Sequence, residues 1–268
     1  MKEKFVCTPN SDIAKDMLVK TIQDKDRKYS LHRLGVAMHV YADTWAHQNF
    51  AGRNDPINSL VELRVDGMKI ANRWGKIKLF IRKWGLFFLS KRFPLGHGAA
   101  GTNPDLPYIR WEYINGRGEK IVRDNLEIFL DASDHLYSAM LAFKNNDMSL
   151  KFSSLSEARR EKLKELFVRA KSEDENARHQ VWLDALANGE FDFGPQQVEY
   201  CIEGANSFKA LALSSTKHCW IRRKLLQKKY EYRAEFLESD WKLFHDAIQA
   251  HRFDVIHDIL PKYGICAG

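Results

Sequence analysis

Apolar residues recur at helical spacing through most of this sequence, and this period constrains the fold more than any other feature. In residues 125–143 an apolar side chain returns every three or four positions, as on one face of an amphipathic helix. The same period predicts helices over 155–170, 176–186, 196–213, 220–236 and 241–259. Alternating patterns typical of strands are nearly absent. We therefore expect an all-α fold of seven or eight helices in a single domain, residues 1–268.

One segment interrupts the helical pattern. Residues 94–118 gather most of the proline and glycine turn signals and separate two predicted helical regions. We expect a long ordered loop there, followed by the C-terminal helices over about 155–260. Hydrophobic residues make up 44% of the 268 residues, which is enough to bury a substantial core and excludes a disordered chain.

A helix predicted over about residues 30–51 carries four candidate metal ligands, His32, His39, Asp43 and His47. At about 100° per residue the last three fall within about 60° of His32, so all four share one face. Imidazole and carboxylate groups suit zinc and related divalent ions, and four-residue spacing places donors one turn apart. A single His–Asp pair would indicate an ordinary surface ion pair, but four such residues favour a site. His32 is a ligand, a partner that orients one, or a phosphate contact.

The central loop offers two further candidates. His97 stands between Gly96 and Gly98, and Asp105 follows Pro104 at a turn. Such a loop can close over a site and supply the remaining ligands or catalytic groups. The alternative is that both side chains only satisfy backbone groups of the loop.

Two other sets of residues repeat the four-residue spacing without a third ligand type on the same face. Asp131 with His135 is one, and Asp254 with Asp258 is the other. We expect ion pairs or helix caps at these positions rather than ligands.

The helix motif also carries a resemblance to known proteins. Its residues LHRLGVAMHVYADTWAHQNFAG resemble the zinc-dependent phospholipase C and single-strand nuclease superfamily, in which an H-x-x-x-D helix binds metal ions that hydrolyse phosphodiesters. More narrowly, they are similar to an uncharacterised bacterial family with an LH-x-LG-x-x-x-H-x-YAD-x-x-x-H-x-x-F helix. That family also has GH and PD-x-P-Y-x-x-W-x-Y segments, which here begin at Gly96 and Pro104. The resemblance covers roughly residues 5–145 and implies a multi-helix phospholipase C-like domain.

The chain also departs from the superfamily pattern. Several metal ligands of the superfamily come from segments upstream of the helix, but no histidine precedes His32 here. We therefore expect a shortened member without the usual upstream segment, holding one or two ions rather than a three-metal cluster.

The resemblance and the ligand helix together predict a metal-dependent hydrolase of phosphodiester or phospholipid substrates, with zinc as the first-choice ion. His39, Asp43 and His47, with His32, would hold the metal, which lowers the pKa of a bound water. Asp105 or His97 would orient that water or protonate the leaving group. The alternative is a catalytically inactive, metal-stabilised helical module with a membrane- or partner-binding role.

Charge distribution suggests partners. The formal net charge of +7 favours anionic partners such as phosphorylated substrates, lipid headgroups or nucleic acid. Residues 75–93 combine cations with aromatic side chains, which predicts either peripheral membrane contact or a core-packed helix. Residues 221–233 form a second basic segment, most simply a solvated helix face. Nucleic acid is the less favoured partner because the sequence contains no recognised binding module.

Cysteine spacing and the N-terminus indicate the compartment. The four cysteines are widely dispersed, which is typical of a reduced environment. The first twenty residues contain no apolar run of the kind found in signal peptides, so we expect a cytoplasmic protein, with peripheral membrane association as an extension. The sequence predicts no particular oligomeric state.

Overall fold

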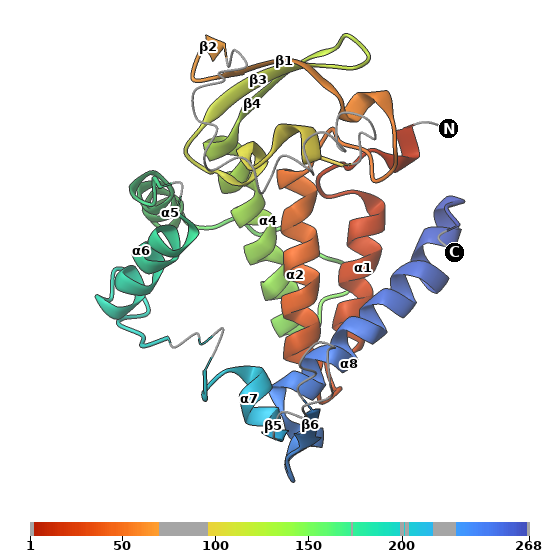
Figure 1. The fold of residues 1–268 in the computed structure, drawn as a ribbon, viewed down its shortest axis with the longest axis vertical. Helices are drawn as coiled ribbons and strands as arrows, with labels where there is room; N and C mark the ends of the chain where they lie inside the picture. Colours follow the sequence, from red (N-terminus) through yellow and green to blue (C-terminus); the bar gives the residue numbers. More distant parts are fainter. Residues whose placement is uncertain are drawn as a thin grey trace, which may run out of the picture.

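The computed structural model describes residues 3–69, 96–172, 174–198, 201, 204–216 and 229–266, and it mixes helices with strands (Figure 1). The α-helices are α1 (Asp12–Gln23), α2 (Ser30–Ala46), α4 (Asn125–Asn145), α5 (Glu157–Arg169), α6 (Glu175–Ala187), α7 (Phe208–Ala212) and α8 (Asp240–Phe253). The strands are β1 (Leu60–Val65), β2 (Met68–Lys69), β3 (Arg110–Asn115), β4 (Lys120–Asp124), β5 (Leu213–Thr216) and β6 (Lys229–Tyr232). A π-helical turn, Asp254–Ile259, extends α8.

Helices α1, α2 and α4 lie side by side, and α8 crosses α2 obliquely (Figure 1). On α2 the core positions are Ala37, Tyr41 and Trp45, which recur every fourth residue and are fully buried. They pack against Met17 of α1 and Ala139 of α4. Because residues four apart lie on one helix face, the period that predicts this helix also directs these side chains into the core.

A four-stranded antiparallel sheet, in the order β2-β1-β3-β4, covers the C-terminal end of α2 (Figure 1). Its inner face holds a second core around Trp111 and Tyr113 of β3, whose rings stack with centroids 5.0 Å apart. Phe50, just beyond α2, stacks on Tyr113 at 5.7 Å. The sheet therefore rests directly on the segment that follows the predicted ligand helix.

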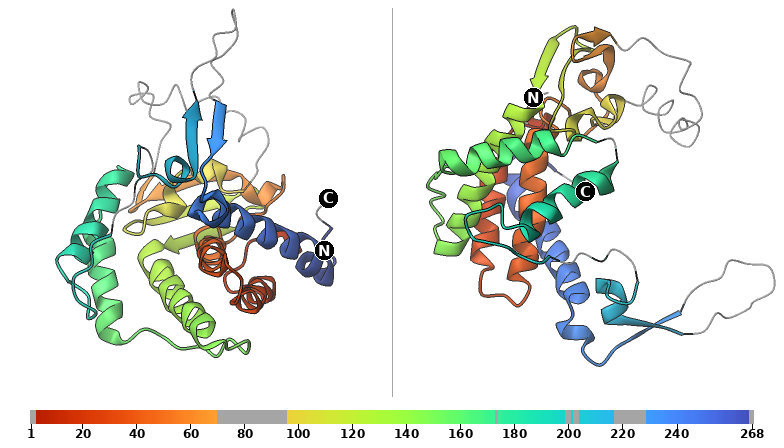
Figure 2. Two further views of the ribbon diagram at one scale, coloured as in Figure 1. Left: turned by 90° about the horizontal axis from the view of Figure 1, so that it is seen from below. Right: turned by 90° about the vertical axis from the view of Figure 1, so that its left-hand side faces the viewer.

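The prediction of an all-α fold is wrong, because the described chain contains two antiparallel sheets. Strand β3 lies within residues 94–118, where the abundant turn signals conceal a short alternation of buried and less buried residues. The helices predicted over 196–213 and 220–236 are also wrong in large part. There the described residues form only the short α7 and the hairpin strands β5 and β6, which Figure 2 shows extending from the lower end of the molecule.

Three predicted helices are confirmed, since α4, α5 and α6 match residues 125–143, 155–170 and 176–186 within two residues at each end. Capping side chains define two of the starts. Ser156 accepts a hydrogen bond from the backbone N–H of Arg159, and Asp174 from that of Asn176. Helices α5 and α6 form an arm beside α4, attached through the ion pair of Arg160 with Asp134 (Figure 1).

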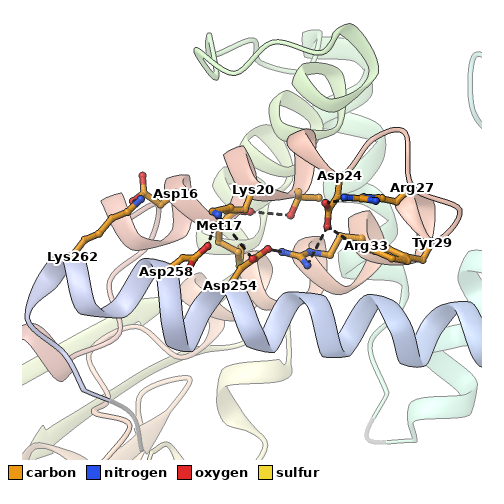
Figure 3. Close-up of polar contacts among 11 residues, drawn as sticks. Asp16, Met17, Lys20, Asp24, Arg27, Tyr29, Arg33, Asp254, Asp258 and Lys262 are labelled. Atoms are coloured by element: carbon orange, nitrogen blue, oxygen red, sulfur yellow. Dashed lines mark hydrogen bonds and ion pairs between the residues drawn. The ribbon is translucent and has the colours of Figure 1, made fainter.

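A buried arginine anchors the C-terminal helix to α1 and α2 (Figure 3). The Arg33 side chain is 0% exposed, and its Nη2 donates to Oδ2 of Asp254 over 2.7 Å. Its Nη1 lies 3.5 Å from Oδ2 of Asp24. Lys20 pairs with Asp258 at 2.5 Å, which confirms the ion-pair prediction for Asp254 and Asp258. This network fixes the lower half of α2 against the π-helical turn.

Two sequence predictions fall beyond the described ranges. Residues 75–93, expected to contact a membrane or to pack into the core, lie outside the described residues, as do residues 221–228 of the second basic segment. Within the described ranges, no helix combines the length and the apolar character needed to span a bilayer.

Candidate functional site

Helix α2 carries the predicted ligands but spreads them along its length. His32 lies in its first turn, whereas His47 caps its C-terminal end with φ −102°. The two residues are fifteen positions apart, or about 22 Å along an axis that rises about 1.5 Å per residue. One end of α2 meets α8 and the other meets the sheet (Figure 1). The structure therefore places His32 and His47 at opposite ends of α2.

His32 contacts the C-terminal helix. Its Nε2 lies 3.0 Å from Oδ1 of Asp240, the first residue of α8. Four residues earlier, just before α2, Lys28 pairs with Glu238 at 2.7 Å. Both contacts join the N-terminal end of α2 to the segment that begins α8, so His32 stands apart from the other three candidates.

His39 and Asp43 form a pair on the helix surface. Nε2 of His39 lies 3.7 Å from Oδ2 of Asp43, one turn further along α2. The His39 side chain is 78% exposed, so most of its imidazole faces solvent. His39 and Asp43 therefore form an i, i+4 surface pair, and Asp43 links His39 to the other candidate residues.

The structure brings His47 together with both candidates from the central loop. The rings of His47 and His97 stack nearly parallel, with centroids 4.1 Å apart and planes 10° from parallel. Nε2 of His47 lies 3.8 Å from Oδ1 of Asp105. Asp43 is close enough to act electrostatically on both histidines. We call Asp43, His47, His97 and Asp105 the two-histidine cluster.

The loop segment that carries His97 and Asp105 is built from two short 3-10 turns. These turns, Gly98–Ala100 and Asn103–Asp105, are joined by Gly101 at φ 62° and ψ −131°, a conformation that a Cβ atom would strain. Nδ1 of His97 lies 3.3 Å from the carbonyl oxygen of Gly101. Because a carbonyl only accepts, this contact places the proton on Nδ1 and leaves Nε2 of neutral His97 as an acceptor.

Asn125, which the sequence did not single out, fastens this loop to the helical layer. Its side chain is fully buried, and its amide donates to the carbonyl oxygens of Asn103 and Leu106 over 2.7 and 2.8 Å. Its Oδ1 accepts from the indole N–H of Trp111 over 2.9 Å. Two hydrogen bonds from Asn125 thus hold the turn that presents Asp105, and the third joins Asn125 to β3.

Arg123 on β4 holds the end of α2 that carries His47. Its side chain is 1% exposed and lies over the Trp111 ring, with the guanidinium carbon 5.3 Å from the centroid. Its Nη2 and Nη1 donate to the carbonyl oxygens of Trp45 and Gln48 over 3.0 and 3.2 Å. The last carbonyls of a helix lack intrahelical partners, so this arginine satisfies the end of α2 on either side of His47.

The two imidazoles have different protonation preferences. The Asp105 carboxylate, 3.8 Å from Nε2 of His47, raises the pKa of His47 above its ordinary value, and the Asp43 carboxylate adds to this effect. Burial lowers the pKa of His97, and the charge of His47 lowers it further. Stacked side chains with opposite shifts are typical of sites that handle protons.

Cys7 lies beside the last turns of α2. Its Sγ lies 3.5 Å from the carbonyl oxygen of Thr44. Burial, with the Asp43 carboxylate as a second cause, raises the pKa of Cys7 to about 11. The thiol is therefore protonated at neutral pH, which argues against Cys7 as an attacking group.

Asp131 and His135 form the i, i+4 pair that their spacing predicts, with Nδ1 of His135 3.6 Å from Oδ1 of Asp131, and both also contribute to packing. The indole N–H of Trp45 donates to Oδ2 of Asp131 over 2.6 Å. The imidazole of His135 lies between the rings of Trp45 and Phe152, at centroid distances of 5.0 and 4.8 Å. Both residues therefore hold α4 against the core side of α2.

The cluster offers metal-binding groups but not a finished coordination sphere. Across the residues that the structure describes, no three His, Cys, Asp or Glu side chains are already arranged to hold one metal ion. The cluster nevertheless combines two imidazoles and two carboxylates, and the side chain of Asp105 is 47% exposed, so a ligand can reach it from solvent.

Comparison with known proteins identifies a family. No curated protein and no solved structure matches the chain. A family model described as "Family of unknown function (DUF6765)" matches residues 1–259, a range that includes the whole two-histidine cluster. The chain therefore belongs to this family of unknown function.

Proposed function

We propose that the protein is a metal-dependent hydrolase of phosphodiester bonds, phospholipids included, which acts at the two-histidine cluster. The observation that carries this proposal is the parallel stacking of His47 and His97 beside Asp105. The helix end and the loop come from separate parts of the chain. Arg123 holds the helix end and Asn125 holds the loop, each through side-chain hydrogen bonds to backbone carbonyls. Packing alone does not require two imidazoles and two carboxylates at a solvent-accessible position.

The donor groups fit a divalent ion of the zinc type. Two ligands at about 2.1 Å from a tetrahedral ion lie about 3.4 Å apart. Nε2 of His47 and Oδ1 of Asp105 are separated by 3.8 Å, so a shift of a few tenths of an ångström would suffice. Asp43 is a second carboxylate that acts electrostatically on both histidines. His47, Asp105 and Asp43 would therefore hold the ion.

A bound ion of this kind would lower the pKa of a water molecule and polarise a phosphoryl oxygen. His97 would accept the proton of that water at Nε2, because its Nδ1 hydrogen is engaged with Gly101. His39 would orient Asp43 from the solvent side, over the 3.7 Å contact between them.

The test combines metal content with turnover. The purified protein is analysed for bound transition metals, and hydrolysis of bis(p-nitrophenyl) phosphate and of phosphatidylcholine vesicles is measured with and without a chelator. Asp105→Asn and His47→Asn should lose both the ion and activity. His257→Asn removes an exposed histidine on the π-helical turn and is the matched control, so it should retain both.

The outcomes are distinct. Activity that survives the chelator and the Asp105→Asn change would remove the hydrolase proposal. An ion that is bound through the cluster without any turnover would instead favour the metal-stabilised module. His39→Asn should retain the ion, since the exposed imidazole reaches the cluster only through Asp43.

A further inference from the structure

A second candidate site lies at the other end of α2, where the β5–β6 hairpin meets the start of α8. A cavity of about 350 Å³ opens there. Its lining residues are Leu213, Tyr232, Phe236, Trp241, Lys242 and His245. This volume and a mainly apolar, aromatic lining are typical of small-molecule sites.

Four of the six lining residues carry aromatic rings. Tyr232 and Phe236 lie with their centroids 4.1 Å apart, and Trp241 and His245 with theirs 4.6 Å apart. The two pairs come from different elements, since the first joins β6 to the following turn and the second lies on α8. Aromatic walls of this kind favour a flat ring that can stack on them.

The polar groups of the cavity are mainly donors. Nζ of Lys242 is held 2.6 Å from both carboxylate oxygens of Asp246, which fixes the position of the ammonium. Indole N–H and phenol O–H groups are donors as well. Nδ1 of His245 donates to the carbonyl oxygen of Trp241 over 2.7 Å. The six lining residues include no carboxylate, so the lining suits acceptor atoms on a ligand.

Two lysines contribute positive charge at the cavity. The Asp246 carboxylate compensates part of the Lys242 charge, and the Lys209 ammonium lies 6.0 Å from the Trp241 ring centroid. Because no carboxylate lines the cavity itself, an anionic group is favoured there over a cationic one. Contacts of His32 with Asp240 and of Lys28 with Glu238 hold the start of α8 against the N-terminal end of α2.

We propose that this cavity binds a small molecule in which a flat aromatic ring carries an anionic group. The ring stacks between the aromatic side chains, and the anion accepts a hydrogen bond from Lys242. The inference does not depend on the proposed hydrolase activity, because the cavity shares no residue with the two-histidine cluster.

Three probes with the same ring and different charge test the proposal on the full-length protein. Binding of 2-naphthoate, 2-naphthamide and a 2-naphthyl trimethylammonium salt is measured by isothermal titration calorimetry. We expect the carboxylate to bind about tenfold more tightly than the amide, because a charge-assisted hydrogen bond is the stronger one. The cationic probe should show the weakest binding.

Variants locate the binding. Lys242→Gln should weaken 2-naphthoate about tenfold and leave 2-naphthamide within about twofold. Lys164→Gln on α5, a surface lysine that likewise pairs on its own helix, is the matched control and should change neither affinity. Trp241→Ala should abolish binding of both probes, whereas Trp241→Phe keeps a ring and should retain most of the affinity.

Several results would overturn the proposal. They are equal affinity for the acid and the amide, preference for the cation, unchanged binding in Trp241→Ala, or no detectable binding of 2-naphthoate at millimolar concentration. Circular dichroism on each variant separates lost binding from lost folding, and the Trp241→Phe variant decides the case if the alanine variant does not fold.

Discussion

Arg123 and Trp45 join the sheet to the end of the site helix, because Nη2 of the arginine donates to the carbonyl oxygen of Trp45 over 3.0 Å. Trp45 stands two residues before His47, and its carbonyl belongs to the last turn of α2. A cation at this end also opposes the negative end of the helix dipole. The position of His47 is therefore set from β4, which is distant in sequence.

The Arg123→Met variant tests this role. It removes two charge-assisted hydrogen bonds, to the carbonyl oxygens of Trp45 and Gln48, so we expect a loss of about 3 kcal/mol of unfolding free energy. Arg123→Lys should lose less, because it keeps the charge but cannot bridge both oxygens. Urea denaturation provides the measurement. Wild-type stability in the methionine variant would show that Arg123 does not support the helix end.

Asn125 provides a second test of how the cluster is held. Replacing it with alanine removes the two bonds to the loop carbonyls of Asn103 and Leu106 and should cost about 2–4 kcal/mol. Hydrogen exchange over residues 97–106 should accelerate in this variant. Asn145→Ala, at the exposed last residue of the same helix, is the control and should leave both stability and exchange unchanged. Unaltered exchange in the Asn125 variant would contradict the assigned role.

The sequence predicted the long amphipathic helices but not the sheet, for a physical reason. Helices α4 to α6 each repeat their apolar period over three or more turns, which local spacing records. The same period over residues 196–213 and 220–236 predicted helices that the described residues there largely lack. On β3 the buried face shows only Trp111, Tyr113 and Asn115, and one of these three is polar. Strand pairing between β1 and β3 is a long-range contact that no local period records.

The candidate site was predictable in part for the same reason. Helical spacing alone places His39 one turn from Asp43. It did not show that α2 ends at Ala46. The helical rise of about 1.5 Å per residue already separates His32 from His47 by about 22 Å, so sharing one face was not enough to bring all four residues to one ion. The meeting of His47 with His97 and Asp105 depends on a tertiary contact. Arg123 and Asn125 carry no motif, and a buried polar residue on a strand or at a helix start has no distinct sequence signal.

The network in Figure 3 predicts unequal effects for two aspartates on one turn. Asp254→Asn weakens the compensation of the fully buried Arg33, and breaking a buried pair on one side should cost about 3 kcal/mol. Asp258→Asn removes a more exposed partner of Lys20 and should destabilise much less. Thermal or urea unfolding of both variants gives the comparison. Equal losses would show that burial of Arg33 does not decide the energetics.

Stability should also depend on pH through His251, which lies on the inner side of α8 and is 8% exposed. Burial, with the charge of Arg33 as a second cause, lowers the pKa of His251 to about 4. In the unfolded chain a histidine titrates near about 6.5. Above that pH neither state binds the proton. As the pH falls from about 6.5 to about 4, the unfolded chain takes up a proton that the folded protein does not, so stability decreases.

This linkage gives a measurable slope. Between pH 7.5 and 5.0 the His251 contribution should lower the unfolding free energy by about 2 kcal/mol, as calculated from the two pKa values. His251→Gln removes the titrating group. The variant should therefore lose about 2 kcal/mol less stability than wild type between pH 7.5 and 5.0, whatever the variant's stability at pH 7.5. His257→Gln, at an exposed histidine of the neighbouring turn, should keep the wild-type slope. A cavity or repacking at position 251 changes stability equally at both pH values, so only the difference in stability between pH 7.5 and pH 5.0 reports the proton. If wild type and His251→Gln show the same difference, the buried imidazole does not titrate as inferred.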